Sequence, residues 1–278
     1  MRAALVLLLL SPSLYAHRSL NFDFDDNIFV TDAKVYLWDS AAKKELGFST
    51  AEWSHVRDTV GKAGKLKNAV QREDFLRDFE DGKNGSKVFT GQIERALTAQ
   101  KWKGPVWDAF VYAMSDAALR DRTHIITARG HASKTLVEGF EVLQKAKLIE
   151  AVPAKENAFA VLGPDLPAEF KDISSSESKA KVMISLLDGL NKEPLAPGEK
   201  RHLWAFSDDD FGNISKAWKA LAAEVARDRW KKTTVLLAFT GTNNPKEKPR
   251  CFVIDKKGER ACTKTEKARS FYPPFAKK

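Results

Sequence analysis

The chain has 278 residues and a mass of 31.1 kDa, which suits one large domain or one domain with an inserted module. Hydrophobic residues make up 43% of the sequence, enough for a sizeable core, so we expect the chain to fold alone. The net charge of +9 favours attraction of anionic substrates, but lysine and arginine are interspersed with acidic residues and form no long basic tail, so no nucleic-acid partner is expected.

The first sixteen residues have the pattern of an export signal. Met1 and Arg2 give a positive start, residues 3–10 are apolar, and residues 11–16 resemble a cleavage region. The apolar run is far shorter than the ~20 residues that a membrane-spanning helix needs. We therefore expect cleavage near Ala16, export to the periplasm or the outside, and no stable membrane span. An uncleaved anchor and a misassigned start codon are the alternatives.

A short predicted strand follows at residues 19–22 and ends on an acidic cluster. The next segment, residues 33–118, is rich in lysine, aspartate, tryptophan and phenylalanine. We expect it to form an inserted, mostly helical module with a small hairpin at residues 33–46. Its tryptophans are expected to pack inside the module, with stacking on a substrate ring as the alternative; they are Trp38, Trp53, Trp102 and Trp107. The predicted helices of this segment lie at residues 50–62, 72–79, 91–100 and 106–118.

From residue 121 onward, predicted strands and helices alternate. This alternation predicts a doubly wound, mostly parallel α/β sheet built from residues 17–32 and 119–278. Residues 152–174 are rich in proline and are expected to form an irregular connector, and Asn213 is the expected N-cap of a later helix. The predicted strands lie at residues 123–127, within 148–152, at 201–206 and at 233–239, and the predicted helices at residues 132–146, at 179–190 and after residue 213.

Two cysteines flank a predicted hairpin near the end of the chain. Asp255 and Gly258 are spaced as in a type I turn, and if they face each other the register places Cys251 opposite Cys262. A cross-strand disulfide fits this register, and an exported protein would be oxidised enough to form it. The alternative is a pair of small buried residues. With no histidine or third cysteine nearby, we expect no metal site here.

Three predicted strands end on polar side chains. They are Asp23 with Asp25, Thr127 with Arg129, and Asp208 with Asp209. In an open parallel sheet, ligands bind beyond the carboxyl ends of the strands. Two acidic clusters at one edge would repel each other unless a cation lay between them, and an all-oxygen site with room for phosphate suits Mg²⁺.

These residues lie in four ordered motifs that resemble those of the haloacid dehalogenase-like superfamily of phosphatases and phosphotransferases. The first motif, a hydrophobic strand followed by Asp-x-Asp, matches Asp23-Phe24-Asp25. The resemblance implies that Asp23 is the nucleophile, which becomes an aspartyl phosphate, and that Asp25 is the acid/base. The second motif matches the strand ending at Thr127, which would hold a phosphate oxygen. Arg129 would then face phosphate or simply start the next helix.

The third motif, a lysine that opens a helix, matches Lys179, with Lys181 as the alternative. The fourth, an acidic pair at a strand end, matches Asp208, which would bind the metal, and Asp209, which would support it. The resemblance thus implies a Rossmann-like core with Mg²⁺ held by Asp208 and by both aspartates of the first motif. It also implies that the insertion is a helical cap domain, which usually sets substrate choice.

One position departs from the family pattern. The family commonly has threonine two residues after the second aspartate, whereas this chain has Asn27. An asparagine side chain also bonds nearby backbone, so we expect a functional substitution in a supporting role. Asp26 and Asp210 are expected to be solvated loop residues, and His124 to be a core residue with a hydrogen-bond partner.

The function predicted from these motifs is an exported, Mg²⁺-dependent phosphomonoester hydrolase that acts on a small phosphorylated substrate through an aspartyl phosphate. Transfer of phosphate to an acceptor other than water is the first alternative. A binding protein that keeps the fold without turnover is the second, and Asn27 is the residue that favours it. The sequence identifies neither the natural substrate nor the oligomeric state.

Overall fold

The computed structural model describes residues 15–62, 64–82, 87–170, 173–195, 197–241, 248–255, 258–264 and 266. Most of the predicted signal, residues 1–14, lies outside this part of the chain. Among the described residues, every helix is too short or too polar to cross a membrane.

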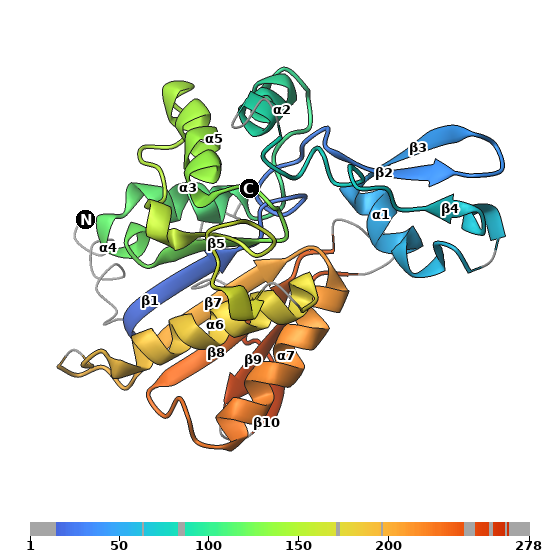
Figure 1. Ribbon diagram of the computed structural model, residues 1–278. Coiled ribbons are helices and arrows are strands. Elements are labelled where there is room, and N and C mark those ends of the chain that lie inside the picture. Colours follow the sequence, from blue (N-terminus) through green and yellow to red (C-terminus); the bar gives the residue numbers. More distant parts are fainter. Residues whose placement is uncertain are drawn as a thin grey trace.

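A seven-stranded sheet forms the centre of the molecule (Figure 1). Its strand order is β10-β9-β8-β7-β1-β5-β6; the strands from β8 to β6 are parallel, and β9 and β10 add an antiparallel hairpin at one edge. The prediction of a mostly parallel α/β sheet is confirmed. The strands are β1 (Tyr15–Phe22), β5 (Thr123–Thr127), β6 (Ala158–Ala160), β7 (Arg201–Asp208), β8 (Thr233–Phe239), β9 (Arg250–Asp255) and β10 (Gly258–Ala261).

Helices cover both faces of the sheet because its central strands bury side chains on both sides. Along β7, Leu203 and Ala205 join one hydrophobic cluster, while Trp204 and Phe206 join another, since alternate residues of a strand face opposite ways. The first cluster contains side chains of α2, α3, α4 and α5, and the second those of α6 and α7. These helices are α2 (Lys87–Leu97), α3 (Trp107–Ser115), α4 (Ala117–Arg120), α5 (Ser133–Lys145), α6 (Ser175–Lys192) and α7 (Phe211–Ala226).

A second, smaller unit stands to one side of the sheet (Figure 1). Its three antiparallel strands have the order β3-β2-β4, and the β2–β3 hairpin confirms the one predicted in this region. Its buried side chains form two small clusters of their own. We call the described residues between 33 and 79 the small module; its elements are β2 (Lys34–Asp39), β3 (Lys44–Ser49), α1 (Thr50–Val56), η1 (Arg57–Thr59), η2 (Gly64–Leu66) and β4 (Ala69–Val70).

The predicted insertion, residues 33–118, divides into two parts by its packing. The small module packs largely on itself, whereas α2 and α3 pack against the main sheet. Phe89 of α2 and Phe110 of α3 are fully buried in the same cluster as Phe22 of β1. Trp107 belongs to that cluster too, in agreement with the predicted packing role. The part of the insertion that contains α2 and α3 therefore belongs to the main hydrophobic core.

Two strands differ from their predicted positions. The strand predicted within residues 148–152 is wrong, and the edge strand is β6, inside the predicted connector. Ile149 instead packs against the main core from outside any strand. β1 begins at Tyr15, earlier than predicted and ahead of the expected cleavage at Ala16. Cleavage there would leave the strand from His17 onward.

The helix predicted at residues 72–79 is also wrong, because most of these residues form turns. Phe75 O accepts a hydrogen bond from Tyr36 N over 2.9 Å, and Asp78 Oδ2 accepts one from Lys34 N over 2.9 Å. The segment thus bonds the neighbouring strand β2, and its own backbone bonds are short turns, such as Phe79 N to Leu76 O over 2.7 Å, that do not continue into a helix. Such contacts between distant residues override a local helical pattern.

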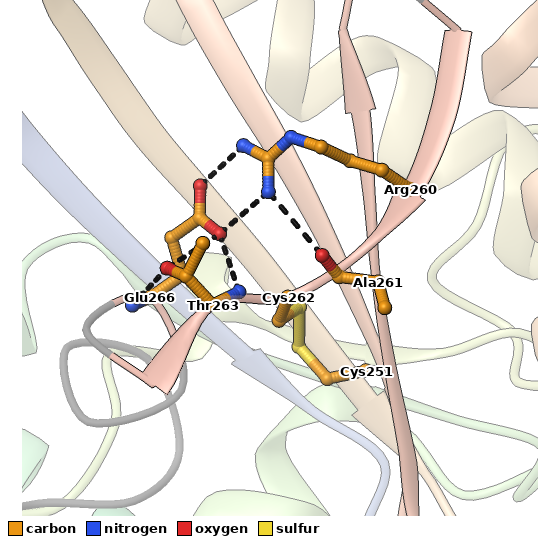
Figure 2. Close-up of a disulfide and its surroundings, with 6 residues drawn as sticks. All are labelled: Cys251, Arg260, Ala261, Cys262, Thr263 and Glu266. Carbon is orange, nitrogen blue, oxygen red and sulfur yellow. Dashed lines mark hydrogen bonds and ion pairs between the residues drawn. A yellow bond between two sulfur atoms is a disulfide. The ribbon is translucent and has the colours of Figure 1, made fainter.

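The predicted disulfide is present at the edge of the sheet (Figure 2). Gly258 pairs with Asp255 in the β9–β10 hairpin, which brings Cys262 opposite Cys251 as the register predicted. The two cysteine Cα atoms are 5.3 Å apart, and Cys262 N donates a hydrogen bond to Cys251 O over 3.0 Å. A disulfide is compatible with an exported protein.

Reduction of this disulfide is expected to lower the free energy of unfolding by about 3 kcal/mol, the chain-entropy value for a short closed loop. Urea unfolding of the protein with and without reductant measures the change. The matched control is the double variant Cys251→Ser with Cys262→Ser, which should resemble the reduced protein and show no response to reductant. An unchanged unfolding curve for the reduced protein would contradict the prediction.

Candidate active site

The candidate site lies at the carboxyl ends of the parallel strands, where the order of strands in the sheet reverses. From β1 the chain passes to β5 and β6 on one side, and later to β7 and β8 on the other. In such sheets the ligand crevice lies at this reversal. Asp23 follows β1 directly, and Asp208 ends the neighbouring β7. Because Asp23 N donates to Ser207 O over 2.9 Å, the two aspartates start from adjacent backbone positions.

Asn27 holds the loop that carries Asp23. Its buried Nδ2 donates to Asp23 O over 3.1 Å, and to Ser207 O and Oγ over 3.1 and 2.9 Å. Its Oδ1 accepts a hydrogen bond from Thr240 Oγ1 over 3.1 Å. The predicted bond from this side chain to nearby backbone is confirmed. The amide also connects the ends of β1, β7 and β8, so it supports the site from beneath the loop.

Lys179 lies near the start of α6, which opens with a capping box. Its Nζ donates to Asp23 Oδ1 and to Asp208 Oδ2, each over 2.8 Å, and the side chain is 2% exposed. Lys181 is exposed and donates to the backbone carbonyl of Glu169 over 3.1 Å. Of the two lysines that match the third motif, the structure therefore brings only Lys179 to the acidic cluster.

Three buried carboxylates surround this ammonium group. Asp23, Asp208 and Asp209 each place an oxygen within 4.8 Å of the others. Two of these residues are predicted metal ligands. The third predicted ligand, Asp25, lies outside the group, and Asp209, expected only to support the metal, takes its place. The arrangement can hold a cation through oxygen atoms alone.

The site contains more negative than positive charge. Burial raises the pKa of Asp23 to about 8, helped by the charges of Asp208 and Asp25 and opposed by Lys179. Burial also raises the pKa of Asp208, and it raises that of Asp209 well above its usual range. Burial alone would lower the pKa of Lys179, but Asp208 and Asp23 together outweigh it and raise this pKa. One ammonium thus faces three carboxylates, an imbalance that a divalent cation would relieve.

Arg129 is a fully buried side chain that binds Asp25. Its Nη2 and Nε donate to the two carboxylate oxygens of Asp25 over 2.6 and 2.9 Å, and its Nη1 donates to Gln92 Oε1 over 3.0 Å. The ring centres of Phe24 and Phe89 lie 5.5 and 4.6 Å from the guanidinium carbon. Arg129 therefore orients Asp25 and is not among the residues that line the cavity described below.

Replacing Arg129 by methionine is expected to lower the free energy of unfolding by about 3–5 kcal/mol, because the change leaves the Asp25 carboxylate without its buried partner. Urea unfolding measures the loss. Arg95→Met is the matched control: Arg95 also binds an aspartate, Asp32, over 2.6 Å, but both side chains are exposed. An exposed pair of this kind contributes about 1 kcal/mol or less. Equal losses in the two variants would contradict the assignment.

Asp26 and Asp210 are not the solvated loop residues that the sequence predicts, because both bind the small module. Asp26 is buried and accepts a hydrogen bond from Thr50 Oγ1. Burial raises the pKa of Asp26 to about 6, while the bond from Thr50 opposes the rise. Asp210 Oδ2 pairs with Arg57 Nη1 over 2.8 Å. These two contacts fix the module against the sheet on either side of α1.

Asp210 is also the N-cap of α7, where its Oδ1 accepts a hydrogen bond from Gly212 N over 2.7 Å. The prediction that Asn213 caps this helix is therefore wrong. Asn213 lies inside the first turn, and its Nδ2 donates to Asp208 Oδ2 over 3.1 Å. Asp208 also accepts a hydrogen bond from Asp210 N over 2.8 Å. The start of α7 thus holds one of the three clustered carboxylates in place.

A cavity of about 300 Å³ lies between the acidic cluster and the small module. Its lining on the core side includes Asp23, Asp25, Thr127, Lys179 and Asp209. Thr127 is buried at the end of β5 and lines the cavity there. Predicted site residues from each of the four motifs thus line one space, whereas Asp208, Asn27 and Arg129 are not among the residues that line it.

Sequence reasoning missed most of the cavity lining that the small module supplies. Arg57 lies there, and nothing in its neighbourhood distinguishes it among the 46 lysines and arginines of the chain. Trp53 lies there as well, although packing was the favoured interpretation for all four tryptophans of the insertion. Arg57 and Trp53 reach the site only because the small module packs next to the acidic cluster, and no local sequence pattern predicts that packing.

His124 is a core residue with a hydrogen-bond partner, as predicted. Its Nδ1 lies 2.6 Å from Asn21 Oδ1, and burial lowers its pKa to about 4. It does not line the cavity, whose polar lining includes carboxylates, Lys179, Arg57, the amides of Gln71 and Asn213, and hydroxyl groups. Comparison of the chain with protein-family models, with curated proteins and with solved structures found no match.

Proposed function

We propose that the chain is a Mg²⁺-dependent phosphomonoester hydrolase of the haloacid dehalogenase-like type, with Asp23 as its nucleophile. The observation that carries the proposal is the position of Lys179 Nζ, 2.8 Å from both Asp23 Oδ1 and Asp208 Oδ2, where the strand order reverses. Buried charges of this kind are a poor source of stability, and they gather at functional sites. The cluster suits a site that binds an anion and a cation together.

The donor set fits a hard divalent cation. Asp23, Asp208 and Asp209 offer oxygen atoms within 4.8 Å of one another, and burial raises the pKa of all three. Carboxylate oxygens with adjoining room for phosphate suit Mg²⁺. When bound, Mg²⁺ would neutralise the carboxylates and the charge on the transferring phosphoryl group.

In the proposed reaction, Asp23 attacks the phosphorus and forms an aspartyl phosphate as the bond to the leaving oxygen breaks. Lys179 holds the attacking carboxylate and offsets negative charge on the phosphoryl oxygens. Thr127 donates a hydrogen bond to one of these oxygens. Asp25 gives a proton to the leaving oxygen and later takes one from the water that hydrolyses the intermediate. Its two bonds from Arg129 set the orientation of its carboxyl group.

Phosphate release from a generic aryl phosphate tests the proposal. The purified protein should release phosphate with Mg²⁺ present and lose this activity in a chelator. Added alcohols separate the alternatives, because a phosphorylated alcohol among the products would indicate a phosphotransferase. Binding without release, across a panel of small phosphorylated metabolites, would instead indicate a binding protein and would overturn the proposal.

We also propose that the chain is exported after cleavage near Ala16. The disulfide between Cys251 and Cys262 supports this, since such bonds persist mainly in oxidising compartments. The mass of the mature protein, purified from a host that exports it, tests the proposal. A mature chain that begins at His17 is the expected result, and a mass that retains residues 1–16 contradicts it.

A further inference from the structure

The cavity has two chemically different sides. The core side carries the carboxylates, Lys179 and Thr127, whereas the small module contributes five apolar or aromatic side chains together with the polar side chains of Thr50, Ser54, Arg57 and Gln71. Leu162, which follows β6, extends the apolar side and is 43% exposed, one of the few large hydrophobic residues so exposed in the described chain. The large apolar side chains of the lining are Val35, Trp53, Phe75, Leu76, Phe79 and Leu162.

Part of this apolar lining remains accessible to a ligand. Trp53, Phe75 and Leu76 are only half-buried, although they pack against the small clusters of the module. Accessible apolar surface beside polar groups that converge on one point is typical of a small-molecule site. Covering such surface with an apolar ligand group is favourable, and aromatic side chains contribute further through ring contacts.

The segment that carries Trp53 is fixed to the core at both ends. Thr50 begins α1 and donates a hydrogen bond to Asp26, and Arg57 follows the helix and pairs with Asp210 over 2.8 Å. Trp53 lies between these two anchors. Its position over the cavity is therefore set before a ligand arrives, which lowers the entropy cost of binding.

We propose that the site is selective for phosphate monoesters with a small aromatic leaving group, and that Trp53 is the specificity-determining residue. The inference rests on the proposed phosphatase function. The phosphate lies toward Asp23 and Lys179, and the ring lies against Trp53 and Phe75. A cavity of about 300 Å³ is at the small end of ligand sites, so it suits a group of one or two rings and not a polymer.

Binding of phosphonates, which have no ester bond to hydrolyse, tests this selectivity without any turnover. Calorimetric titration in Mg²⁺ should show that phenylphosphonate binds at least about tenfold more tightly than methylphosphonate. Trp53→Ala should remove most of this preference by weakening phenylphosphonate binding more than methylphosphonate binding, and Trp53→Phe should retain much of it. Trp38→Ala is the matched control, because Trp38 lies in the same module but does not line the cavity. Its ring instead packs under Arg72, whose guanidinium carbon lies 3.6 Å from the ring centre.

Equal binding of the two phosphonates, no binding of either, or a preference unchanged in Trp53→Ala would overturn the inference. A loss shared by Trp38→Ala would do the same, since it would show a general effect on the module. Other outcomes distinguish failure of the proposed function from failure of the proposed selectivity. Phenylphosphonate preference without phosphate release refutes the phosphatase and keeps the aromatic site, whereas equally efficient release from phenyl and glycerol phosphates keeps the phosphatase and refutes the selectivity.

Discussion

The variant Asp23→Asn is expected to release phosphate on the order of 10³-fold more slowly than the unchanged protein, or slower still, and to remain folded. Asparagine has nearly the same shape as aspartate but cannot form the acyl phosphate. Its amide oxygen can still accept the hydrogen bond from Lys179 Nζ that Asp23 Oδ1 accepts over 2.8 Å. The measurement is phosphate release from an aryl phosphate in saturating Mg²⁺, together with urea unfolding to confirm the fold.

Asp32→Asn provides the control for this variant. Asp32 lies shortly after the same loop, but it is exposed, binds Arg95 over 2.6 Å and does not line the cavity. Its replacement should leave phosphate release within about twofold of normal, in line with the small effects of surface substitutions. If Asp23→Asn kept full activity, the proposed mechanism would be wrong even if the protein were a phosphatase.

Without divalent cations, the protein is expected to lose stability as the pH rises from 6.5 to 8. In this window Asp23, with its pKa raised to about 8 from the ordinary 3.8, still binds a proton in the folded state but not in the unfolded chain. Stability falls with rising pH wherever the folded state binds more protons, by up to about 1.4 kcal/mol per pH unit for each proton. Asp208 and Asp209, whose pKa values burial also raises, act in the same direction.

Comparison with the Asp23→Asn variant separates the effect of Asp23 from that of the buried histidines. Burial lowers the pKa of His124 to about 4 and that of His131 to about 3. Their opposing effect on stability fades as the pH rises above their ordinary pKa of 6.5, since the unfolded chain then loses its histidine protons, and this effect is the same in the unchanged protein and in Asp23→Asn. Urea unfolding in chelator across the window measures the slope. Asp23→Asn should flatten it, and a slope unchanged in that variant would contradict the assignment to Asp23.

Mg²⁺ should reverse this loss of stability, and more strongly at the upper end of the window. Carboxylates bind the cation in their deprotonated form, so binding displaces protons and tightens as the pH rises. At a concentration about 100-fold above its dissociation constant, a ligand adds ~2.7 kcal/mol to the free energy of unfolding. Unfolding in Mg²⁺ and in Na⁺ of equal ionic strength separates site binding from screening. Equal stabilisation by the two salts would count against a cation site at Asp23, Asp208 and Asp209.

The acidic half of the candidate site could be predicted because its groups follow strong local patterns. β5 and β8 are apolar runs whose predicted bounds match the structure, and β7 ends on the predicted acidic pair. Parallel strands place their carboxyl ends at one edge, so the meeting of Asp23, Thr127 and Asp208 followed from the fold class. The disulfide could be predicted from the turn between Asp255 and Gly258, because the position of the turn fixes which residues of a hairpin lie opposite each other.

The other half of the site could not be predicted, because it depends on contacts between distant segments. Residues 72–79 have a helical pattern but bond β2, and that course brings Phe75 to the cavity. Asp26 looks like a solvated residue in the sequence, yet it is buried because Thr50 reaches it from the small module. Asp209 was expected to support the metal, since an adjacent acidic pair does not reveal which carboxylates the strand end turns toward the cluster.

The central place of β1 in the sheet bears on how the protein is made. Leu20 pairs with Thr123 on one side, and Phe22 pairs with Ser207 on the other. Both partners of the first described strand are therefore synthesised long after the strand itself. Pairings between residues so distant in sequence slow folding, because the entropy cost of closing a long loop precedes the favourable contacts between the strands. The segment with Asp23 can pair with β5 before half of the chain has been synthesised, but with β7 only after about residue 207. The acidic cluster of Asp23, Asp208 and Asp209 therefore assembles only after β7 is available.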